Sequence, residues 1–187
     1  QGPVTRAYQR EALERGAAAF DWETRKQRSG QVRGTKVTGV GIGQAFHAAG
    51  RAGLDGIVRI TPDGKLHIHC GVGNLGTYSY AATSRVAAEV LKVSWDNCII
   101  VRGDSRLGLP MSSPQSGSNT SFTMTRATYA GAMDALAKLK EMAAQTLGGK
   151  ADDYDVENET VFAKADRSRS MTYAAAAQRA IELGGKF

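Results

Sequence analysis

Residues 71–78, GVGNLGTY, and residues 111–121, MSSPQSGSNTS, are two loops rich in glycine or hydroxyl residues, each followed by a helical pattern. The first segment lies between a strand pattern and a helical pattern, and the second opens the longest helical pattern of the sequence. Glycines and small hydroxyl residues at the start of a helix let backbone amides approach an anion closely. The two loops therefore predict that one phosphate-bearing ligand is held between them.

Around these loops, side-chain periodicity predicts strands, turns and helices in mixed order. Apolar and polar residues alternate on both sides of Thr61-Pro62-Asp63-Gly64, which is typical of an antiparallel hairpin with one buried and one solvated face. Helical spacing and apolar runs predict the later elements. We expect strands near 57–60, 66–70 and 98–101, helices near 79–93, 118–147 and 174–183, and a second hairpin over 154–173.

The first quarter of the chain predicts a helix and a glycine-rich strand. Apolar residues at helical spacing amid many charges indicate an amphipathic helix from about Thr5 to Arg28. Glycines alternate along Lys36 to Ala48, which is typical of a strand that another backbone approaches closely. Together the elements predict an α+β fold with a mixed or antiparallel sheet, whose hairpins are covered by long helices, in one domain over residues 1–187.

Composition limits the classes of function. The 187 residues carry 24 Lys plus Arg and 18 Asp plus Glu, for a net charge of +6. No aromatic residues interleave the basic cluster after Trp22, so we expect no nucleic-acid partner. No apolar run reaches the roughly 18 residues of a membrane span. Cys70 and Cys98 lack zinc-site or disulfide spacing, which predicts free thiols in the cytoplasm.

Catalytic and metal-binding patterns of the familiar kinds are absent from the sequence. Of the histidines His47, His67 and His69, two form an i, i+2 pair on the face of the hairpin that we expect to be solvated. No Cys, Asp or Glu at a matching spacing completes a metal site. There is no Gly-x-Ser-x-Gly elbow. The sequence therefore predicts no catalytic residue and no protein ligand to a metal.

Two alternatives to a domain that binds one phosphate-bearing ligand between these loops stay open at this point. Residues 71–76 match the G-x-G-x-x-G fingerprint of a nucleotide-binding, Rossmann-like dehydrogenase domain. That fingerprint requires a parallel βαβ unit, whereas the strand before Gly71 belongs to a hairpin. It also requires an acidic residue at the end of the next strand, and the nearest candidate, Asp104, lies too far along the chain. The other alternative is a non-catalytic interaction domain with a basic surface.

An ordered set of short motifs resembles the molybdenum-binding subunit of the xanthine dehydrogenase and aldehyde oxidase family. More narrowly, it resembles the first part of the second cofactor-binding domain of that subunit, and the likeness covers nearly the whole chain. The resemblance implies a molybdenum cofactor-binding domain-like fold in a fragment of a larger subunit. The motifs are Gly39 onward, Asp63-Gly64, Gly73 to Tyr78, Ala87-Ala88-Glu89-Val90-Leu91, Gly103-Asp104, Pro110, Ser112-Ser113-Pro114 and Gly117-Ser118.

The resemblance also implies which residues hold the molybdopterin cofactor. In the first loop the family usually has glycine, glutamine, glycine, where this chain has Gly76, Thr77 and Tyr78. Thr77 keeps one hydrogen-bond donor, and Tyr78 replaces a glycine where a backbone approaches closely. In the second loop the family binds the pterin and its phosphates through small residues and hydroxyls. The matching residues are Gly117, Ser118, Asn119, Thr120 and Ser121.

The activity implied by the resemblance is that of a molybdenum hydroxylase. Such an oxidoreductase hydroxylates an aldehyde or N-heterocycle with water as the oxygen source. Its pterin can take the cytosine dinucleotide form, and iron-sulfur and FAD groups on partner subunits or domains carry electrons. The family's general base is a glutamate that follows a glycine, and no Gly-Glu pair occurs here. We therefore expect the remainder of the molybdenum subunit as a partner, and no turnover from this chain alone.

Overall fold

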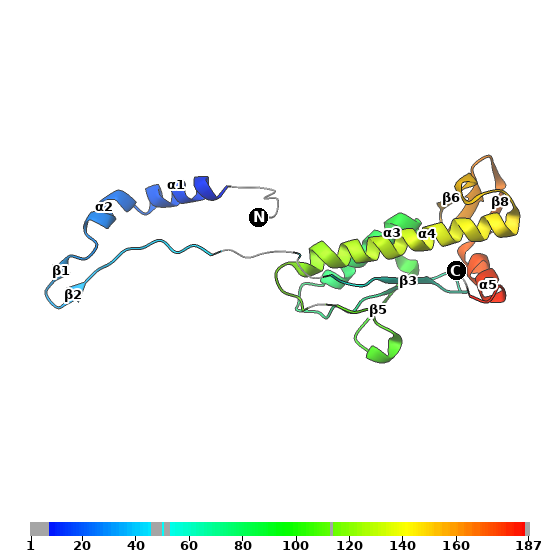
Figure 1. Ribbon diagram of the computed structural model, residues 1–187, viewed down its shortest axis with the longest axis horizontal. Helices are drawn as coiled ribbons and strands as arrows, with labels where there is room; N and C mark the ends of the chain where they lie inside the picture. The colour runs from blue at the N-terminus through cyan, green and yellow to red at the C-terminus, as the bar shows by residue number, and fades with distance from the viewer. Residues whose placement is uncertain (1–7, 46–49, 51–52, 113, 186–187) are drawn as a thin grey trace. The chain divides into compact units, whose positions relative to one another are not determined.

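The computed structural model in Figure 1 describes residues 8–45, 50, 53–112 and 114–185. Contacts within the chain group it into two compact units, Gln1–Phe46 and His47–Phe187, each of which is described by itself. The single domain expected over 1–187 stays a prediction. Some residues named above lie outside the described ranges. They are His47, Ser113, the two ends of the chain and the last residues of the strand expected up to Ala48.

The first unit consists of short elements with no buried side chain among its described residues. Its elements are α1 (Gln9–Ala19), α2 (Trp22–Gln27), β1 (Val32–Arg33) and β2 (Lys36–Val37). The expected single helix is divided at Asp21, whose φ of 54° is left-handed. The strand expected from Lys36 is also wrong beyond Val37. Side chains added at Gly41 or Gly43 would meet no atom within 4 Å, so the described residues make no close approach there.

The second unit contains a mixed sheet of three strands in the order β3-β4-β5. Strands β3 (Ile57–Ile60) and β4 (Leu66–His69) form the predicted antiparallel hairpin. Strand β5 (Cys98–Val101) pairs parallel to β4, and helix α3 (Ser79–Leu91) connects the two. The predicted mixed sheet is therefore confirmed. Strand β4 therefore belongs both to the hairpin and to a parallel βαβ unit that contains the first loop. We had expected the hairpin to exclude such a unit.

A second sheet follows the long helix of this unit. The helix begins as a π-helical turn, η3 (Thr120–Met124), and continues as α4 (Thr125–Leu147). Strands β6 (Tyr154–Glu157), β7 (Thr160–Ala163) and β8 (Asp166–Thr172) form an antiparallel meander, where a single hairpin was expected. Helix α5 (Tyr173–Glu182) ends the described elements. The predicted α+β class, with hairpins covered by long helices, is confirmed.

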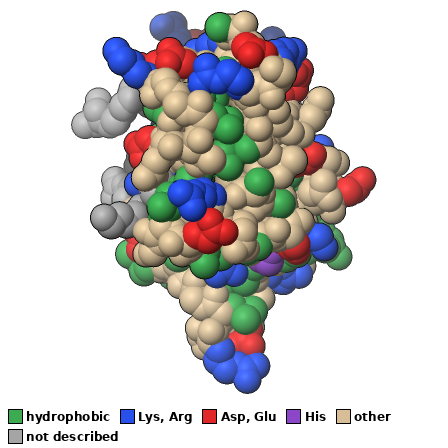
Figure 2. All heavy atoms as spheres, turned by 90° about the vertical axis from the view of Figure 1, so that its right-hand side faces the viewer, with side chains coloured by type: hydrophobic (Ala, Val, Ile, Leu, Met, Phe, Trp, Pro, Cys, Tyr) green, Lys and Arg blue, Asp and Glu red, His purple; other side chains and the backbone are tan. Residues whose placement is uncertain are grey.

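The core of the second unit lies between β4, α3, α4 and the second sheet. Leu66, Ile68 and Leu91 are fully buried there, together with the aromatic side chains of Tyr154 and Tyr173. Burying apolar surface of this kind contributes most of the folding free energy. On the face of the second unit that Figure 2 shows, Lys and Arg side chains lie interspersed with Asp and Glu.

Two burial predictions for this sheet are wrong. His69, expected on a solvated face with His67, is only 7% exposed. The reason is that the segment after β5 covers this histidine, whose Nδ1 lies 3.2 Å from the Gly108 carbonyl oxygen. Ile99, in a strand expected to be fully buried, is 36% exposed, and it pairs with the half-buried His67 on the same, partly solvated face of the sheet.

Helix α4 touches the backbone at Gly56, directly before β3. A Cβ added to Gly56 would lie 2.3 Å from the carbonyl oxygen of Ala127, so the two backbones are in contact at this point. Figure 1 shows α4 lying along β3. None of the helices in the described ranges combines the length and apolar character needed to cross a membrane.

Candidate functional site

The first loop is folded by the side chain of Asn74. Its Oδ1 accepts hydrogen bonds from the amides of Gly76, at 2.9 Å, and Tyr78, at 3.2 Å. Gly76 has a φ of 90° and Tyr78 a φ of 51°. Tyr78 therefore adopts a left-handed conformation that glycine favours, although it carries a side chain. Tyr78 is 63% exposed, so its ring points away from the core. The loop backbone therefore keeps the conformation that a glycine at this position would adopt.

The second loop turns sharply into the long helix. Gly117 and Ser118 have φ values of 58° and 55°, and the π-helical turn begins two residues after Ser118, at Thr120. Thr120 is buried, whereas Ser118 and Ser121 are exposed. Among the described residues, no backbone acceptor is seen for the amides of Thr120 and Ser121. These amides and the exposed hydroxyls are donors at the positive end of a long helix.

Hydrogen bonds join the two loops through residues that were not among the predicted cofactor-binding residues. Gln115 donates through Nε2 to Ser79 Oγ at 3.1 Å, which links the second loop to the first residue of α3. Ser112 donates through Oγ to the Gly71 carbonyl at 2.8 Å. Gly71 lacks room for a side chain, because an added Cβ would lie 2.4 Å from the Pro110 carbonyl oxygen. The glycine of this motif thus serves loop-to-loop packing.

Helices α3 and α4 direct their N-terminal ends to the same end of the unit. The Gln115–Ser79 hydrogen bond joins their N-terminal sides. At the other end, Tyr173 donates to the Leu91 carbonyl of α3 at 2.6 Å. Tyr154 likewise donates to the Gly148 carbonyl just after α4, also at 2.6 Å. Because Tyr154 and Tyr173 both flank the second sheet, the two helices run side by side with their positive dipole ends together.

The segments that form both loops contain no acidic residue. No Asp or Glu occurs from Gly71 to Ala88 or from Ser105 to Met133. Asp104, the acidic residue weighed for a Rossmann-like ribose contact, instead binds the side chain and amide of Arg106. The Arg106 side chain is the main cause of the lowered pKa of Asp104. The loops themselves are therefore rich in donors and carry no carboxylate, while Asp55 lies beside the start of the second loop, where its amide donates to the Met111 carbonyl at 3.1 Å.

The predicted site residues thus fall into two groups. Gly76, Thr77 and Tyr78 lie at the N-terminal end of α3, and Gly117, Ser118, Asn119, Thr120 and Ser121 lie at the N-terminal end of the η3–α4 helix. A hydrogen bond from a glutamine or serine side chain to another loop leaves no periodic pattern in the sequence. The roles of Gln115 and Ser112 in joining the loops were therefore missed. Their clustering with Gly117 was the available hint.

His69 lies near the loop that follows β5. Its Nδ1 donates to the Gly108 carbonyl at 3.2 Å, and its buried Nε2 has no hydrogen-bond partner among the described residues. Within the described ranges no three His, Cys, Asp or Glu side chains are grouped as metal ligands.

Comparison with known proteins relates the chain to molybdenum proteins. The family model of the molybdopterin cofactor-binding domain matches residues 15–186. The aldehyde oxidoreductase molybdenum-binding subunit PaoC of Escherichia coli O157:H7 is 32% identical over 139 residues, covering 74% of this chain and 18% of PaoC. PaoC of Escherichia coli strain K12 is 31% identical over the same share of each chain. This chain spans less than a fifth of these relatives, at 18% of their length.

Solved structures share the fold. The Cu,Mo-CO dehydrogenase in its carbon monoxide reduced state matches with a TM-score of 0.61 and 21% identity, over 72% of this chain and 17% of the other. Quinoline 2-oxidoreductase from Pseudomonas putida 86 matches with a TM-score of 0.55 and 17% identity, over 92% of this chain and 23% of the other.

Proposed function

Because this chain belongs to the molybdopterin cofactor-binding domain family, we propose that the adjoining N-terminal ends of α3 and α4 hold the anionic part of molybdopterin. The observation that carries this proposal is the Gln115–Ser79 hydrogen bond, which brings two positive helix ends to one place. The family match favours this function over a Rossmann-like dehydrogenase or an interaction domain.

The donors at this place fit a phosphate-bearing group. The amides of Thr120 and Ser121 lack acceptors within the described residues, and the exposed hydroxyls of Thr77, Ser118 and Ser121 are further donors. Phosphate oxygens accept such bonds, and the nearest carboxylates in sequence lie outside both loops. When bound, the molybdenum group supplies redox chemistry, while residues of this chain bind and orient its organic part.

We further propose that the chain is part of a molybdenum hydroxylase acting on an aldehyde or an N-heterocycle. Relatives named aldehyde oxidoreductase and quinoline 2-oxidoreductase support this substrate class. The proposed partners are the remainder of the molybdenum subunit together with iron-sulfur and FAD-bearing subunits or domains. The cytosine dinucleotide form of the pterin belongs to the same proposal. Two free cysteines support a reducing, cytoplasmic location.

Replacement of loop hydroxyls in the complete enzyme tests the site. Ser118→Ala combined with Ser121→Ala removes two exposed donors worth about 1 kcal/mol each, so we expect a lower pterin and molybdenum content after purification. Gln145→Ala, an exposed change at the far end of α4, is the matched control. Equal pterin content in the double variant and the control would reject this assignment of the second loop.

A further inference from the structure

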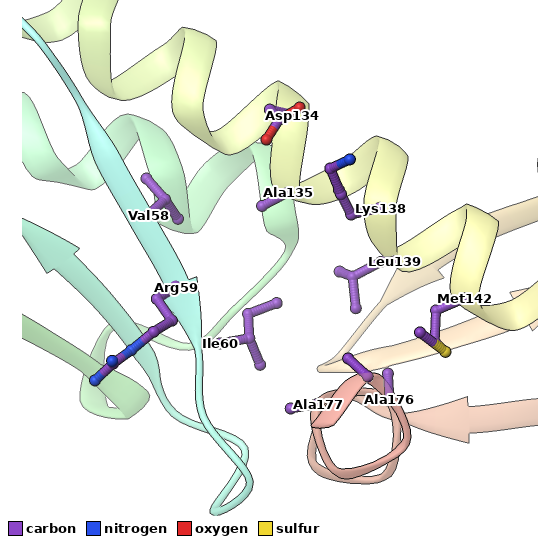
Figure 3. A pocket seen from close by; sticks show the side chains of 11 residues that line it. Val58, Arg59, Ile60, Asp134, Ala135, Lys138, Leu139, Met142, Ala176 and Ala177 are labelled. Carbon is purple, nitrogen blue, oxygen red and sulfur yellow. The ribbon is translucent and has the colours of Figure 1, made fainter. Parts of the chain in front are cut away.

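The free edge of β3 borders an apolar groove. This groove, with a volume of about 210 Å³, lies between β3, α4 and α5. Figure 3 shows Ile60, Leu139 and Met142 around the space between these elements, with Ala176 and Ala177 of α5 on its far side. It lies away from the two cofactor loops, whose residues do not line it.

The backbone of β3 presents unpaired groups at this edge. Thr61 donates to the Lys65 carbonyl at 3.1 Å, which makes Thr61 and Lys65 a hydrogen-bonded pair of the hairpin. In an antiparallel ladder such pairs alternate, so Arg59 bonds to β4 while Val58 and Ile60 direct their amides and carbonyls outward. β3 is an edge strand of its sheet, and no further described strand pairs with it.

Val58 and Ile60 contribute both to the groove and to the unpaired backbone edge of β3. Val58 and Ile60 line the groove, and their outward backbone groups lie at its border. An exposed edge strand is a template for another strand, and an adjacent pocket accepts alternate side chains of that strand. Arg59 and Lys138 lie at the groove with one carboxylate, Asp134, which favours an occupant with an acidic side chain.

We propose that an extended, apolar and acidic strand from the remainder of the molybdenum subunit pairs with β3 through Val58 and Ile60 and fills this groove. The inference rests on the proposed function for the existence of that remainder. The PaoC relatives support this source, because the matched region is only 18% of one continuous chain. A strand on the same polypeptide reaches the edge at high effective concentration.

Amide hydrogen exchange resolved to single residues tests the pairing. In this chain alone, the Val58 and Ile60 amides are expected to exchange fast, whereas the Arg59 amide is protected by β4. In the complete subunit, we expect protection of Val58 and Ile60 to rise about 100-fold or more, as for a paired strand. Ala180→Glu, in the groove, should abolish that gain, and the exposed Ala175→Glu on the same helix should preserve it.

Each other outcome overturns the proposal. Fast exchange at Val58 and Ile60 in the complete subunit would show that the edge stays free. Protection in this chain alone that rises with protein concentration would identify a second copy as the occupant. Protection of Arg59 reports an intact hairpin in every sample. The readout also holds in cofactor-free protein, so a failure of pterin binding and a failure of strand pairing are distinguished.

Discussion

The hydroxyl of Tyr173 donates a hydrogen bond of 2.6 Å to the carbonyl oxygen of Leu91, the last residue of α3. Both side chains are fully buried. This bond satisfies a carbonyl at a helix end, where no partner within the helix is available. It also ties the first residue of α5 to the helix whose other end forms the candidate site.

Removal of this hydroxyl is expected to destabilise the chain. Tyr173→Phe keeps the ring in place but leaves the Leu91 carbonyl unpaired, which costs about 1–3 kcal/mol of unfolding free energy. Tyr129→Phe, at a position 48% exposed, is the control and should change stability little. Chemical denaturation of both variants measures the difference. An unchanged midpoint for Tyr173→Phe would show that the bond is not needed.

The same hydroxyl predicts a loss of stability at alkaline pH. Burial, followed by the charges of Glu159 and Asp155, raises the pKa of Tyr173 well above its ordinary value. The unfolded chain therefore loses this proton first, so the stability is fully present below about pH 10 and falls as pH rises further. Tyr173→Phe should show a shallower alkaline decline. Denaturation curves between neutral and alkaline pH decide it, and identical slopes would contradict the pKa shift.

Gly56 is expected to tolerate no side chain. The Cβ of Gly56→Ala would lie 2.3 Å from the Ala127 carbonyl oxygen and 2.6 Å from its carbon, so α4 would have to move off β3. Such overpacking against backbone should cost about 2 kcal/mol or more. Gly53→Ala is the matched control, because an added Cβ there meets nothing within 4 Å. Equal thermal midpoints for the two variants would show that the helix yields easily.

The parts of the fold that local chemistry determines could be predicted from the sequence. Asp63-Gly64 identified the hairpin turn, in which Gly64 takes a φ of 81°, and the apolar run at 98–101 matched β5. Helical spacing located α3 and the long helix for the same reason. Asp21 was missed because a left-handed residue within an amphipathic pattern leaves the spacing intact.

The remainder depended on contacts between distant segments. The parallel pairing of Leu66 with Cys98 has no signature in either strand, because any buried strand permits it. His69 is buried, against expectation, by another distant segment, since its Nδ1 lies 3.2 Å from the Gly108 carbonyl oxygen. The site residues at both loops were chosen by resemblance and stay predictions. The link that joins the loops, from Gln115 to Ser79, became visible only with the side chains in place.

Cys98 is expected to react slowly with alkylating reagents. Burial, reinforced by the charge of Glu159, raises the pKa of its thiol to about 11, and Sγ lies 3.5 Å from the Ser94 carbonyl oxygen. At pH 8 the thiolate fraction is therefore low, and labelling by iodoacetamide should be at least about ten-fold slower than for a free thiol. Labelling of the unfolded chain is the control. Equal rates in the folded and unfolded chain would refute this protection.

Gln115 is expected to act as a positioning residue for the cofactor loops. Gln115→Ala removes the 3.1 Å bond to Ser79 Oγ without changing the donors of residues 117–121, so those donors would remain but lose their fixed placement beside α3. We expect lower pterin content in the complete subunit and faster amide exchange over the loop, with a loss of global stability within about 1 kcal/mol. Gln145→Ala, exposed near the end of α4, should change none of these. Normal pterin content together with faster amide exchange over the loop would show that the pterin binds without an ordered loop. Gln115 would then have no role in the cofactor site.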